Sequence, residues 1–532
     1  MTTKTEASAV KGNNRSQWLM ILLAMAMFVL VIDTSMMNVS ISAIVDDLGT
    51  TVSGVQSAIS LEALVSAAFI LIGSKLGDLY GRKRAYMLGL MGYALGALTM
   101  TLTQSITLVI LFWAIVGGLG ASLLLPAMQS LIHGNFEGAE MKKAYALVGA
   151  AAAIAAAVGP LIGGFITTYL SWRVGFLLEF IIIVIVLLNI KLIKDVKYEG
   201  PRDFDVVGAI LSVIGMAGIV ISILIWEDGG ERVGLLMVFG FIAMFAFYRW
   251  LLHNKKQGKP VLIDPELFSF KFFRLGATGL MLQNIILGGM MIVLPIYFQM
   301  VFEYTAMQTG LAIAPMSLSM FALALLAGRR VGRRRPARII QFGYLGAVIG
   351  ILFMILYIPR ATSGWDFLIP MAVTGAGLGL LVSQLNNYSL SPISEERVSE
   401  AAGVNSASGN FGLSFGLAFA GAIMMAALSI AFMNMATSST VLSPDQQEQV
   451  AVALEEDAQV MSDTMLMEQL AGQPEDVQAE ILRINQEARN IALQVALMIP
   501  LAAGLIGFLN SFRMLKLPDP EPSSAAEGVL GG

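Results

Sequence analysis

The sequence contains no cysteine, only two histidines and few charged residues for its length. Without cysteine the chain has no disulfide bonds, no thiolate nucleophile and no sulfur ligand for a metal. The two histidines, His133 and His253, are too few to form a metal site of their own. Charged residues make up 13% of the 532 residues and hydrophobic residues 56%, more apolar surface than a water-soluble fold can bury. Composition therefore predicts a membrane protein with no metal and no cofactor.

Apolar stretches of about 20 residues, enough to cross a bilayer core of about 30 Å, recur along nearly the whole chain. They are too long and continuous for the alternating strands of about 10 residues in a membrane barrel. We predict an all-α polytopic membrane protein whose first span is too long for a cleaved signal. The fourteen predicted spans cover residues 17–44, 53–74, 85–105, 107–132, 143–170, 173–194, 205–226, 233–253, 275–301, 307–328, 339–359, 366–390, 399–434 and 490–514.

Basic residues are divided unevenly between two sets of loops. With the N-terminus in the cytoplasm, the inward loops and tails hold about 28 of the 33 Lys and Arg residues. We therefore predict an integral protein of the cell (plasma or inner) membrane with both termini cytoplasmic. The loop at 435–489 carries 11 acids and two bases, and its apolar spacing predicts two short amphipathic helices in an external hairpin. The hairpin could be a solvated acidic face or a lid over the external mouth.

A basic, glycine-containing loop follows the second span of each half of the chain. GSKLGDLYGRKRA follows the second span and AGRRVGRRRPARI the tenth, which indicates an internal repeat. We predict a six-helix N-terminal half at residues 1–200, two inserted transmembrane helices and the start of a linker at 201–256, and a six-helix C-terminal half at 257–532. Paired halves are the architecture of secondary transporters, whose binding site lies near the midplane between the halves.

Three predicted spans carry one carboxylate each: Asp33, Glu62 and Glu179. A charge at the centre of a membrane helix costs about 2.5–3.5 kcal/mol on insertion scales, so stability cannot explain these residues. A rise of about 1.5 Å per residue places all three in the middle or external half of the membrane. A carboxylate away from water can bind a proton near neutral pH or attract a cationic substrate. The alternative is an acid that stays protonated and hydrogen-bonded, or one that reaches the external end of its span.

Polar side chains in the spans could complete a binding pocket beside the three carboxylates. Amides also commonly join helices in membranes, so many of these residues could serve packing instead. The predicted pocket residues are Asn38, Gln283, Asn284, Tyr297, Gln299 and Asn386, with Gln384, Asn387, Asn405 and Asn410 nearby in sequence.

The stretch LGDLYGRKRAYML resembles the loop signature of the major facilitator superfamily. The matching positions are Asp78, Gly81, Arg82 and Lys83. Ser74 and Leu79 depart from the pattern, and Gly332 stands in place of the acid in the second copy. The resemblance implies a conformational gate in which Asp78 and Arg82 clasp the two halves together on the cytoplasmic side. An ordinary positive-inside loop is the alternative.

The stretch AAVGPLIGG in the fifth predicted span is similar to the motif of the antiporters within this superfamily. Its residues are Gly159, Pro160, Gly163 and Gly164. A general glycine seam for helix packing is the competing interpretation. Together with IDTSMMNVSISAI, SWRVGF, LPIYFQ…QTGLAIAP and the fourteen spans, it makes residues 17–430 resemble the fourteen-span drug:proton antiporter family.

One departure bears on the chemistry: Ala114 and Gly117 stand where the family has an arginine and a glutamine. In the family that arginine tunes protonation, so coupling here needs another route or is absent. The added acids Glu62 and Glu179 move the cavity toward negative charge.

The resemblance implies an exporter of amphiphilic, cationic or zwitterionic organic compounds such as drugs, antiseptics and dyes, coupled to inward proton movement by alternating access. The chain has no nucleotide-binding G-x-x-x-x-G-K-[ST] motif and no nucleophile–base set, so we expect no enzyme activity. Expected partners are the small-molecule substrate, protons and membrane lipid, without nucleic acid, and we expect a monomer. Two alternatives are a proton-independent facilitator or translocator of a lipid-like or metabolite substrate, and a non-transporting membrane receptor or scaffold.

Overall fold

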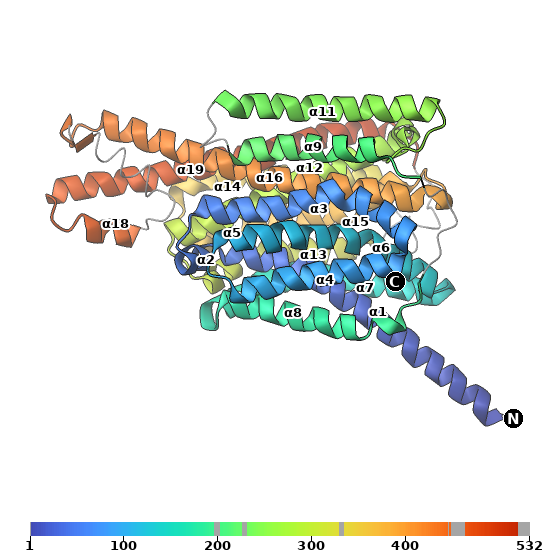
Figure 1. The fold of residues 1–532 in the computed structure, drawn as a ribbon. Helices are drawn as coiled ribbons and strands as arrows, with labels where there is room; N and C mark the ends of the chain where they lie inside the picture. Colours follow the sequence, from blue (N-terminus) through green and yellow to red (C-terminus); the bar gives the residue numbers. More distant parts are fainter. Residues whose placement is uncertain are drawn as a thin grey trace.

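The computed structural model describes residues 2–195, 203–225, 231–328, 335–444, 446–447 and 463–519, and its regular elements within these ranges are all helical. The predicted all-α class is therefore confirmed. Thirteen helices in the described ranges are long and apolar enough to cross a bilayer. A further helix, α8 (Trp172–Leu188), has 17 residues and fills the place of the sixth predicted span. The helices lie side by side in one bundle, and the N-terminal part of α1 (Thr2–Val39) projects from it (Figure 1).

The helices that precede residue 195 pack mainly on one another. They are α1 (Thr2–Val39), α2 (Ile41–Leu48), α3 (Val52–Tyr80), α4 (Arg82–Leu102), α5 (Ile106–Leu108), η1 (Val109–Gly117), α6 (Gly118–Asn135), α7 (Gly138–Tyr169), α8 and η2 (Ile190–Leu192). Helix α1 packs on α7 and α8, and α4 packs on α6, α8 and η1. We name helix ends cytoplasmic or external according to the orientation predicted from the basic residues.

A second group of helices follows the linker. They are η3 (Pro265–Ser269), α12 (Lys271–Val301), α13 (Ala306–Gly328), α14 (Pro336–Tyr357), η4 (Ile358–Arg360), η5 (Gly364–Phe367), α15 (Leu368–Leu390), α16 (Glu395–Ser438), α18 (Asp463–Gln469) and α19 (Glu475–Leu515). Helix α12 packs on α16 and α19, and α15 packs on α13 and α14. The basic loop at 329–334, with Gly332, lies outside the described residues.

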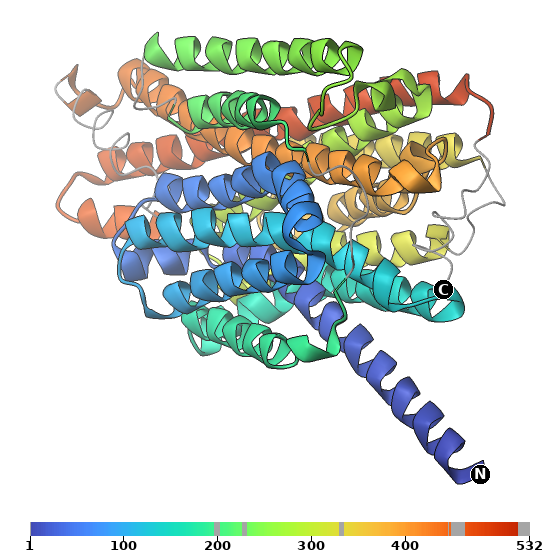
Figure 2. The same cartoon turned by 45° about the vertical axis from the view of Figure 1, so that its right-hand side comes forward.

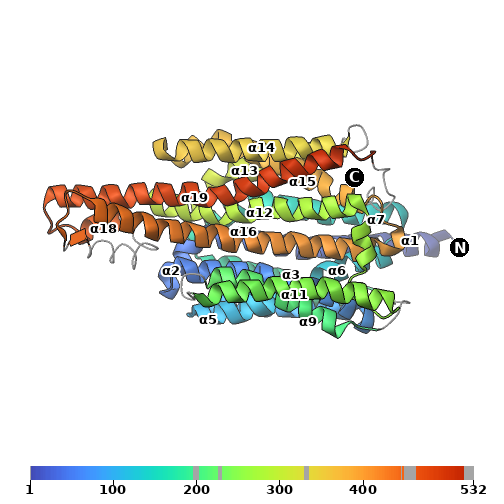
Figure 3. The ribbon, with the colours of Figure 1, turned by 90° about the horizontal axis from the view of Figure 1, so that it is seen from above.

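The external hairpin differs from the prediction of two separate short helices. Helices α16 and α19 have 44 and 41 residues, about 60 Å each at 1.5 Å per residue, and extend well beyond the other helices (Figure 3). The second predicted hairpin helix is therefore the first part of α19, continuous with the last span. The shorter α18 is held at the base of this extension: the amide groups of Asn485 and Gln486 each donate to Asp463 at 2.7 Å.

The two inserted helices, α9 (Val206–Leu224) and α11 (Glu231–Lys256), pack on each other, and α9 also packs on α3 and α16 (Figure 1). They form a separate pair at one edge of the bundle in both views (Figures 1 and 2). Asp205 fixes the pair to the linker, because its carboxylate accepts from the Gly208 amide at 2.8 Å, the Trp250 indole at 2.9 Å and the Leu262 amide at 3.2 Å. The domain boundaries near residues 200 and 256 stay predictions.

The linker is joined to the cytoplasmic start of α16 through Asp264. Its carboxylate lies 2.6 Å from the Lys255 ammonium and 3.1 Å from the Arg397 guanidinium. Burial acts to raise the pKa of Asp264, but hydrogen bonds from Lys255 and the Glu266 amide, with the charges of Lys255 and Arg397, hold that pKa below its ordinary value. The inserted pair is thus tied to the helices that follow it.

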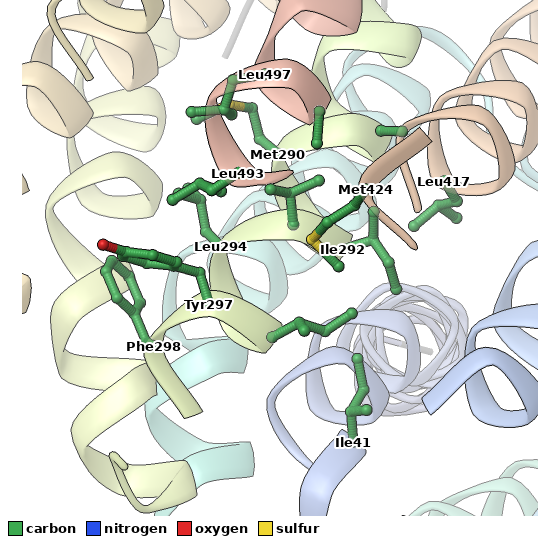
Figure 4. Close-up of a cluster of buried hydrophobic side chains, with 14 of the residues drawn as sticks. Ile41, Met290, Ile292, Leu294, Tyr297, Phe298, Leu417, Met424, Leu493 and Leu497 are labelled. Carbon is green, nitrogen blue, oxygen red and sulfur yellow. The ribbon is translucent and has the colours of Figure 1, made fainter. Parts of the chain in front are cut away.

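The two groups of helices meet along two seams, α3 against α16 and α7 against α13. A large apolar cluster continues across their external part. In it, Ile41 of α2 lies with Met290, Ile292 and Leu294 of α12 and Leu417 of α16 (Figure 4). Burial of such side chains excludes water from the space between the groups at that level.

Candidate functional site

Asp33 lies inside the bundle, 1% exposed, and is held by donors from two other helices. The Tyr93 hydroxyl, from α4, donates to Oδ2 of Asp33. The Trp113 indole Nε1–H, from η1, lies 3.2 Å from Oδ1 and 3.1 Å from Oδ2. Both donors are neutral, and the described residues include no ion pair to Asp33.

Trp113 reaches Asp33 from a stretch of π-helix. Element η1 spans Val109–Gly117 and includes Ala114, the position at which the resembled family has arginine. A π-helix has a wider turn than an α-helix and occurs often at functional sites. Sequence reasoning missed Tyr93 and Trp113. The sequence signal for both is an aromatic side chain that carries one polar group within an apolar span. The Tyr hydroxyl and the Trp indole N–H need a hydrogen-bond partner when they are buried.

Glu179 and Glu62 lie in the same part of the molecule as Asp33. The charge of Asp33 acts on each of them directly, and all three carboxylates act on Tyr93. Glu179 is 3% exposed, and within the described residues neither of its carboxylate oxygens has a hydrogen-bond partner. Glu62 is partly exposed. The structure therefore gathers the three predicted carboxylates, from α1, α3 and α8, into one cluster.

The predicted pocket is not open to water at Asp33 and Glu179 in this conformation, because both side chains are almost fully buried. Arg173, only a turn or two from Glu179 along α8, is engaged elsewhere: it forms an ion pair with Asp47 and donates to the Thr103 carbonyl at 2.6 Å. Glu62 is thus the least buried carboxylate of the cluster in this state.

The predicted pocket amides of the second group of helices divide between contacts to other helices and contacts within their own helix. The amide of Asn405 donates to Asn386 at 3.0 Å, and Asn284 donates to the Leu280 carbonyl of its own helix at 2.9 Å. Gln384 donates to Ser383 at 3.2 Å, and Asn410 donates to Ser66 across the α3–α16 seam at 3.2 Å. Gln283 differs, because it is 5% exposed and its carbonyl oxygen has no partner among the described residues. The Asn387 amide nitrogen has none there either.

Gln299 and Tyr297 lie near the external end of α12, as their place near the end of the ninth predicted span leads us to expect. Gln299 accepts from the Ser42 amide at 3.1 Å and the Ser42 hydroxyl at 2.5 Å, and donates to the Val39 carbonyl at 2.8 Å. The Tyr297 hydroxyl donates to Asn490 of α19 at 3.0 Å. Gln299 therefore forms an external latch between the two groups of helices, which we define as its three hydrogen bonds to Val39 and Ser42.

Asn38 is the penultimate residue of α1, next in sequence to Val39 of this latch. Its amide donates to the Thr34 carbonyl of the same helix at 2.7 Å, and its side chain is 2% exposed. Its own carbonyl oxygen has no partner among the described residues. Asn38 thus has an unused acceptor inside the bundle.

The signature loop after α3 holds together elements of the first group of helices. Asp78 and Arg82 form an ion pair one turn apart. Gly81 joins α3 to α4 with φ of 105°, which only glycine adopts easily. Lys83 donates through its ammonium to the Ile193 carbonyl at 2.8 Å and through its amide to Asp195 at 3.0 Å. The contact described for Asp78 is this ion pair within the first group, so the clasp between the two groups of helices stays a prediction.

The glycines of the antiporter-like motif let α7 approach two helices closely. An added Cβ would lie 2.5 Å from the Ser35 Cβ at Gly159 and 2.8 Å from the Met36 Cα at Gly163, both on α1. At Gly164 it would lie 2.5 Å from the Ala306 carbonyl oxygen of α13. Pro160 lies within α7, and its carbonyl faces Gly310 of α13. The motif therefore sits where α7 touches both groups of helices.

Two groups of membrane helices, joined by two seams and enclosing buried carboxylates, define an integral membrane transporter of the two-half type. Solved structures support this fold. The chain matches a bacterial homologue of the human lysosomal transporter Spinster with a TM-score of 0.63, 14% identity, and 96% and 99% of the two chains covered. It matches a D-xylose–proton symporter with a TM-score of 0.56, 13% identity, and 95% and 98% covered.

Sequence comparison gives the family. The family profile of the Major Facilitator Superfamily matches residues 23–417, and the chain belongs to this superfamily of transporters. It is 25% identical to the "Probable actinorhodin transporter" of Streptomyces coelicolor, over 75% of this chain and 70% of that protein. It is 25% identical to the multidrug resistance protein Stp of Mycobacterium tuberculosis (78% and 77%) and 27% identical to the quinolone resistance protein NorB of Staphylococcus aureus (79% and 90%). The resemblance to drug and antibiotic efflux transporters is thus confirmed.

Proposed function

We propose that the protein exports amphiphilic organic compounds that carry a positive charge, driven by protons that move inward through Asp33. The observation that carries the proposal is the cluster of three carboxylates around Tyr93, two of them almost fully buried and none in an ion pair within the described residues. Buried acids cost stability, so a transporter that has three in one half uses them for binding. The drug and antibiotic efflux relatives support the same class of substrate.

The cluster offers two different groups to its two ligands. Glu62 is partly exposed and suits the cationic end of a substrate. Asp33 is shielded from water and bonded to neutral donors, which suits a proton. The buried, unpartnered oxygen of Gln283 lies on the opposite group of helices, where a hydroxyl or amine of the substrate could donate to it. An alternating-access cycle would expose this cluster to each side in turn.

We place the protein as a monomer in the plasma membrane, with both termini in the cytoplasm and lipid around the bundle. The superfamily, the bacterial relatives and the uneven distribution of basic residues support this placement. A membrane potential of 100 mV contributes about 2.3 kcal/mol per net charge moved, so it drives export of a cation when more protons enter than positive charges leave.

The test is transport of ethidium, an organic cation, into inverted vesicles with an imposed pH gradient. Wild-type protein should accumulate ethidium only with the gradient, and Asp33→Asn should abolish this accumulation. Asp46→Asn is the matched control, because Asp46 is an exposed acid in the neighbouring helix α2. Equal, gradient-independent movement in wild type and Asp33→Asn would overturn proton coupling.

A second candidate, a facilitator without proton coupling, is favoured by one observation. No basic side chain pairs with Asp33 in the described residues, and Ala114 stands at the position of the family arginine. Substrate-induced proton release from the purified protein in detergent separates the two functions, because a facilitator would release none when it binds ethidium.

A further inference from the structure

The first membrane span is interrupted near its external end. Helix α1 ends at Val39 and α2 begins at Ile41, and Ser40 between them has φ of −97° and ψ of 3°. The Ser40 amide donates to the Met37 carbonyl at 3.2 Å, three residues earlier, which is a tighter turn than that of an α-helix. The ladder of α-helical hydrogen bonds is therefore broken at Ser40.

A serine side chain holds this break from the side of the first group of helices. The Ser40 hydroxyl donates to the Met36 carbonyl at 2.7 Å, the group to which the Ser40 amide would donate in a continuous α-helix. The Thr167 hydroxyl of α7 lies 2.7 Å from the same hydroxyl oxygen. The single hydroxyl proton of Ser40 is used at Met36, so Thr167 is the donor of this second bond. A serine bonded in this way competes with the helix and bends it.

A glutamine side chain holds the break from the second group of helices. Gln299 donates to the Val39 carbonyl at 2.8 Å and accepts from the Ser42 amide at 3.1 Å. In an unbroken helix the Val39 carbonyl would accept from the Ala43 amide. The Ser42 amide would likewise donate to the Asn38 carbonyl. Gln299 therefore satisfies one acceptor and one donor that the next turn of the helix would otherwise satisfy.

The two supports of the break lie on opposite sides of the external mouth, because Ser40 is bonded within the first group and Gln299 belongs to the second. When the mouth opens, Gln299 moves away with α12, and the Val39 carbonyl and the Ser42 amide lose their partner. Backbone groups inside a protein are nearly always paired. Restoring the helical bonds would satisfy both groups within their own chain segment and would join α1 and α2 into one helix.

We propose that the junction of α1 and α2 is a two-state hinge, broken while Gln299 is bonded to it and continuous once the external side opens. Helix α2 then changes its angle to the rest of the first group, so this group does not move as one rigid body. The hinge rests on the alternating access of the proposed function and not on its proton coupling.

The other end of α2 has an attachment that such a movement can break. Asp47 accepts from the Trp172 indole of α8 at 2.9 Å and forms an ion pair with Arg173. Asp47 is exposed, and an exposed ion pair contributes little to stability. The buried face of α2 packs in the apolar cluster that it shares with α12, and this cluster also parts when the mouth opens.

The hinge is tested by the distance between two spin labels within the first group of helices, measured by pulsed electron paramagnetic resonance on the full-length protein. The labels are placed at Asp46→Cys on α2 and at Gln104→Cys between α4 and α5, both exposed positions. A first group that moves as a rigid body keeps this distance constant, whereas the hinge gives a second distance in the open state. The pair Gln104→Cys and Arg360→Cys reports the opening itself.

Three substitutions distinguish the two states of the hinge. Ser40→Ala removes one bond that holds the break, so the ratio of continuous to broken molecules should rise about fivefold, the effect of one net hydrogen bond. Ala43→Pro should keep the junction broken even together with Gln299→Leu. A proline ring would clash with the Val39 carbonyl in a continuous helix, but it fits the first turn of α2. Ser35→Ala is the matched control, because Ser35 is a buried serine of α1 that bonds to the carbonyl four residues earlier within the unbroken helix.

The expected result is a second distance between the labels at 46 and 104 in Gln299→Leu and in Ser40→Ala, which Ala43→Pro suppresses and Ser35→Ala does not produce. Gln299→Leu carries the test if Ser40→Ala does not melt like the wild type. A single, unchanged distance in both variants and in the wild type with ethidium would overturn the hinge. Failure of proton coupling would appear elsewhere, as ethidium transport that does not respond to a pH gradient.

Discussion

Replacing Gln299 by leucine should open the external side of the transporter. The substitution removes the latch, which is three hydrogen bonds to Val39 and Ser42 made by a side chain only 7% exposed. Each such bond contributes about 0.5–1.5 kcal/mol net, so the closed state loses about 1.5–4.5 kcal/mol relative to a state in which these groups face water. Each 1.4 kcal/mol changes an equilibrium constant about tenfold. The ratio of open to closed molecules should therefore rise about tenfold or more.

The absence of cysteine makes this shift simple to measure. Spin labels at Asp46→Cys and Arg360→Cys, both exposed at the external side of the two groups of helices, give the distance across the mouth by pulsed electron paramagnetic resonance. Gln299→Leu should enlarge the population at long distance. The control is Gln308→Leu, the same change at an exposed glutamine whose side chain accepts from the Thr305 amide of its own group.

The assignment of Gln299 as a latch would be refuted if Gln299→Leu left the label distances unchanged. This holds provided that the same label pair responds to ethidium in the wild type. Loss of the long-distance population would refute it equally, because it would mean that Gln299 stabilises the open state.

Three further predictions concern packing and the linker. Gly164→Val should lower ethidium transport and the melting temperature, because its side chain would meet the Ala306 carbonyl, whereas Gly149→Val should be tolerated because a Cβ there meets nothing within 4 Å. Asp205→Ala should destabilise the protein by about 3 kcal/mol in thermal unfolding, because it leaves three donors at a buried site without an acceptor. The folded pKa of Asp264 lies below its unfolded value, so its contribution is present above about pH 4 and is lost as the pH falls further. Acidification in that range should therefore lower the melting temperature more in the wild type than in Asp264→Asn.

The spans were predictable because hydrocarbon imposes a strong and simple requirement on sequence. About 20 apolar residues are needed per crossing, and the predicted spans coincide with the helices that the structure describes. The ends of the helices were less predictable than the spans. At α19, for example, an amphipathic helix outside the membrane continues into the membrane-spanning helix without a break in helical spacing. Grouping of the acids in one half was also predictable from their positions in the chain.

The partners of the acids were not predictable in the same way. Trp113 donates to Asp33 from η1, a π-helix that packs on α3, α4 and α6, and no residue pattern in that span predicts a π-helix. Gln299 looked like a pocket residue because an amide near the end of a span has the same sequence signal whether it binds substrate or a neighbouring helix. Tertiary contacts distinguish these cases.

The two seams between the groups of helices differ in a way that explains where the inserted pair lies. Along α3–α16, contacts run from Gln56, which faces Leu417 and Gly421, to Leu71 beside Gly403, and α9 covers this seam. Along α7–α13, the close contacts lie at the external end, where Gly164 meets Ala306, while further in along α7 Gly149 has open space where a Cβ would lie.

Separating α3 from α16 would break the hydrogen bonds of Ser414 to Ser60 and of Asn410 to Ser66, and it would expose the apolar cluster beneath α9. Asp205 and Asp264 tie the inserted helices to the linker and to α16. The inserted helices therefore reinforce the seam between α3 and α16.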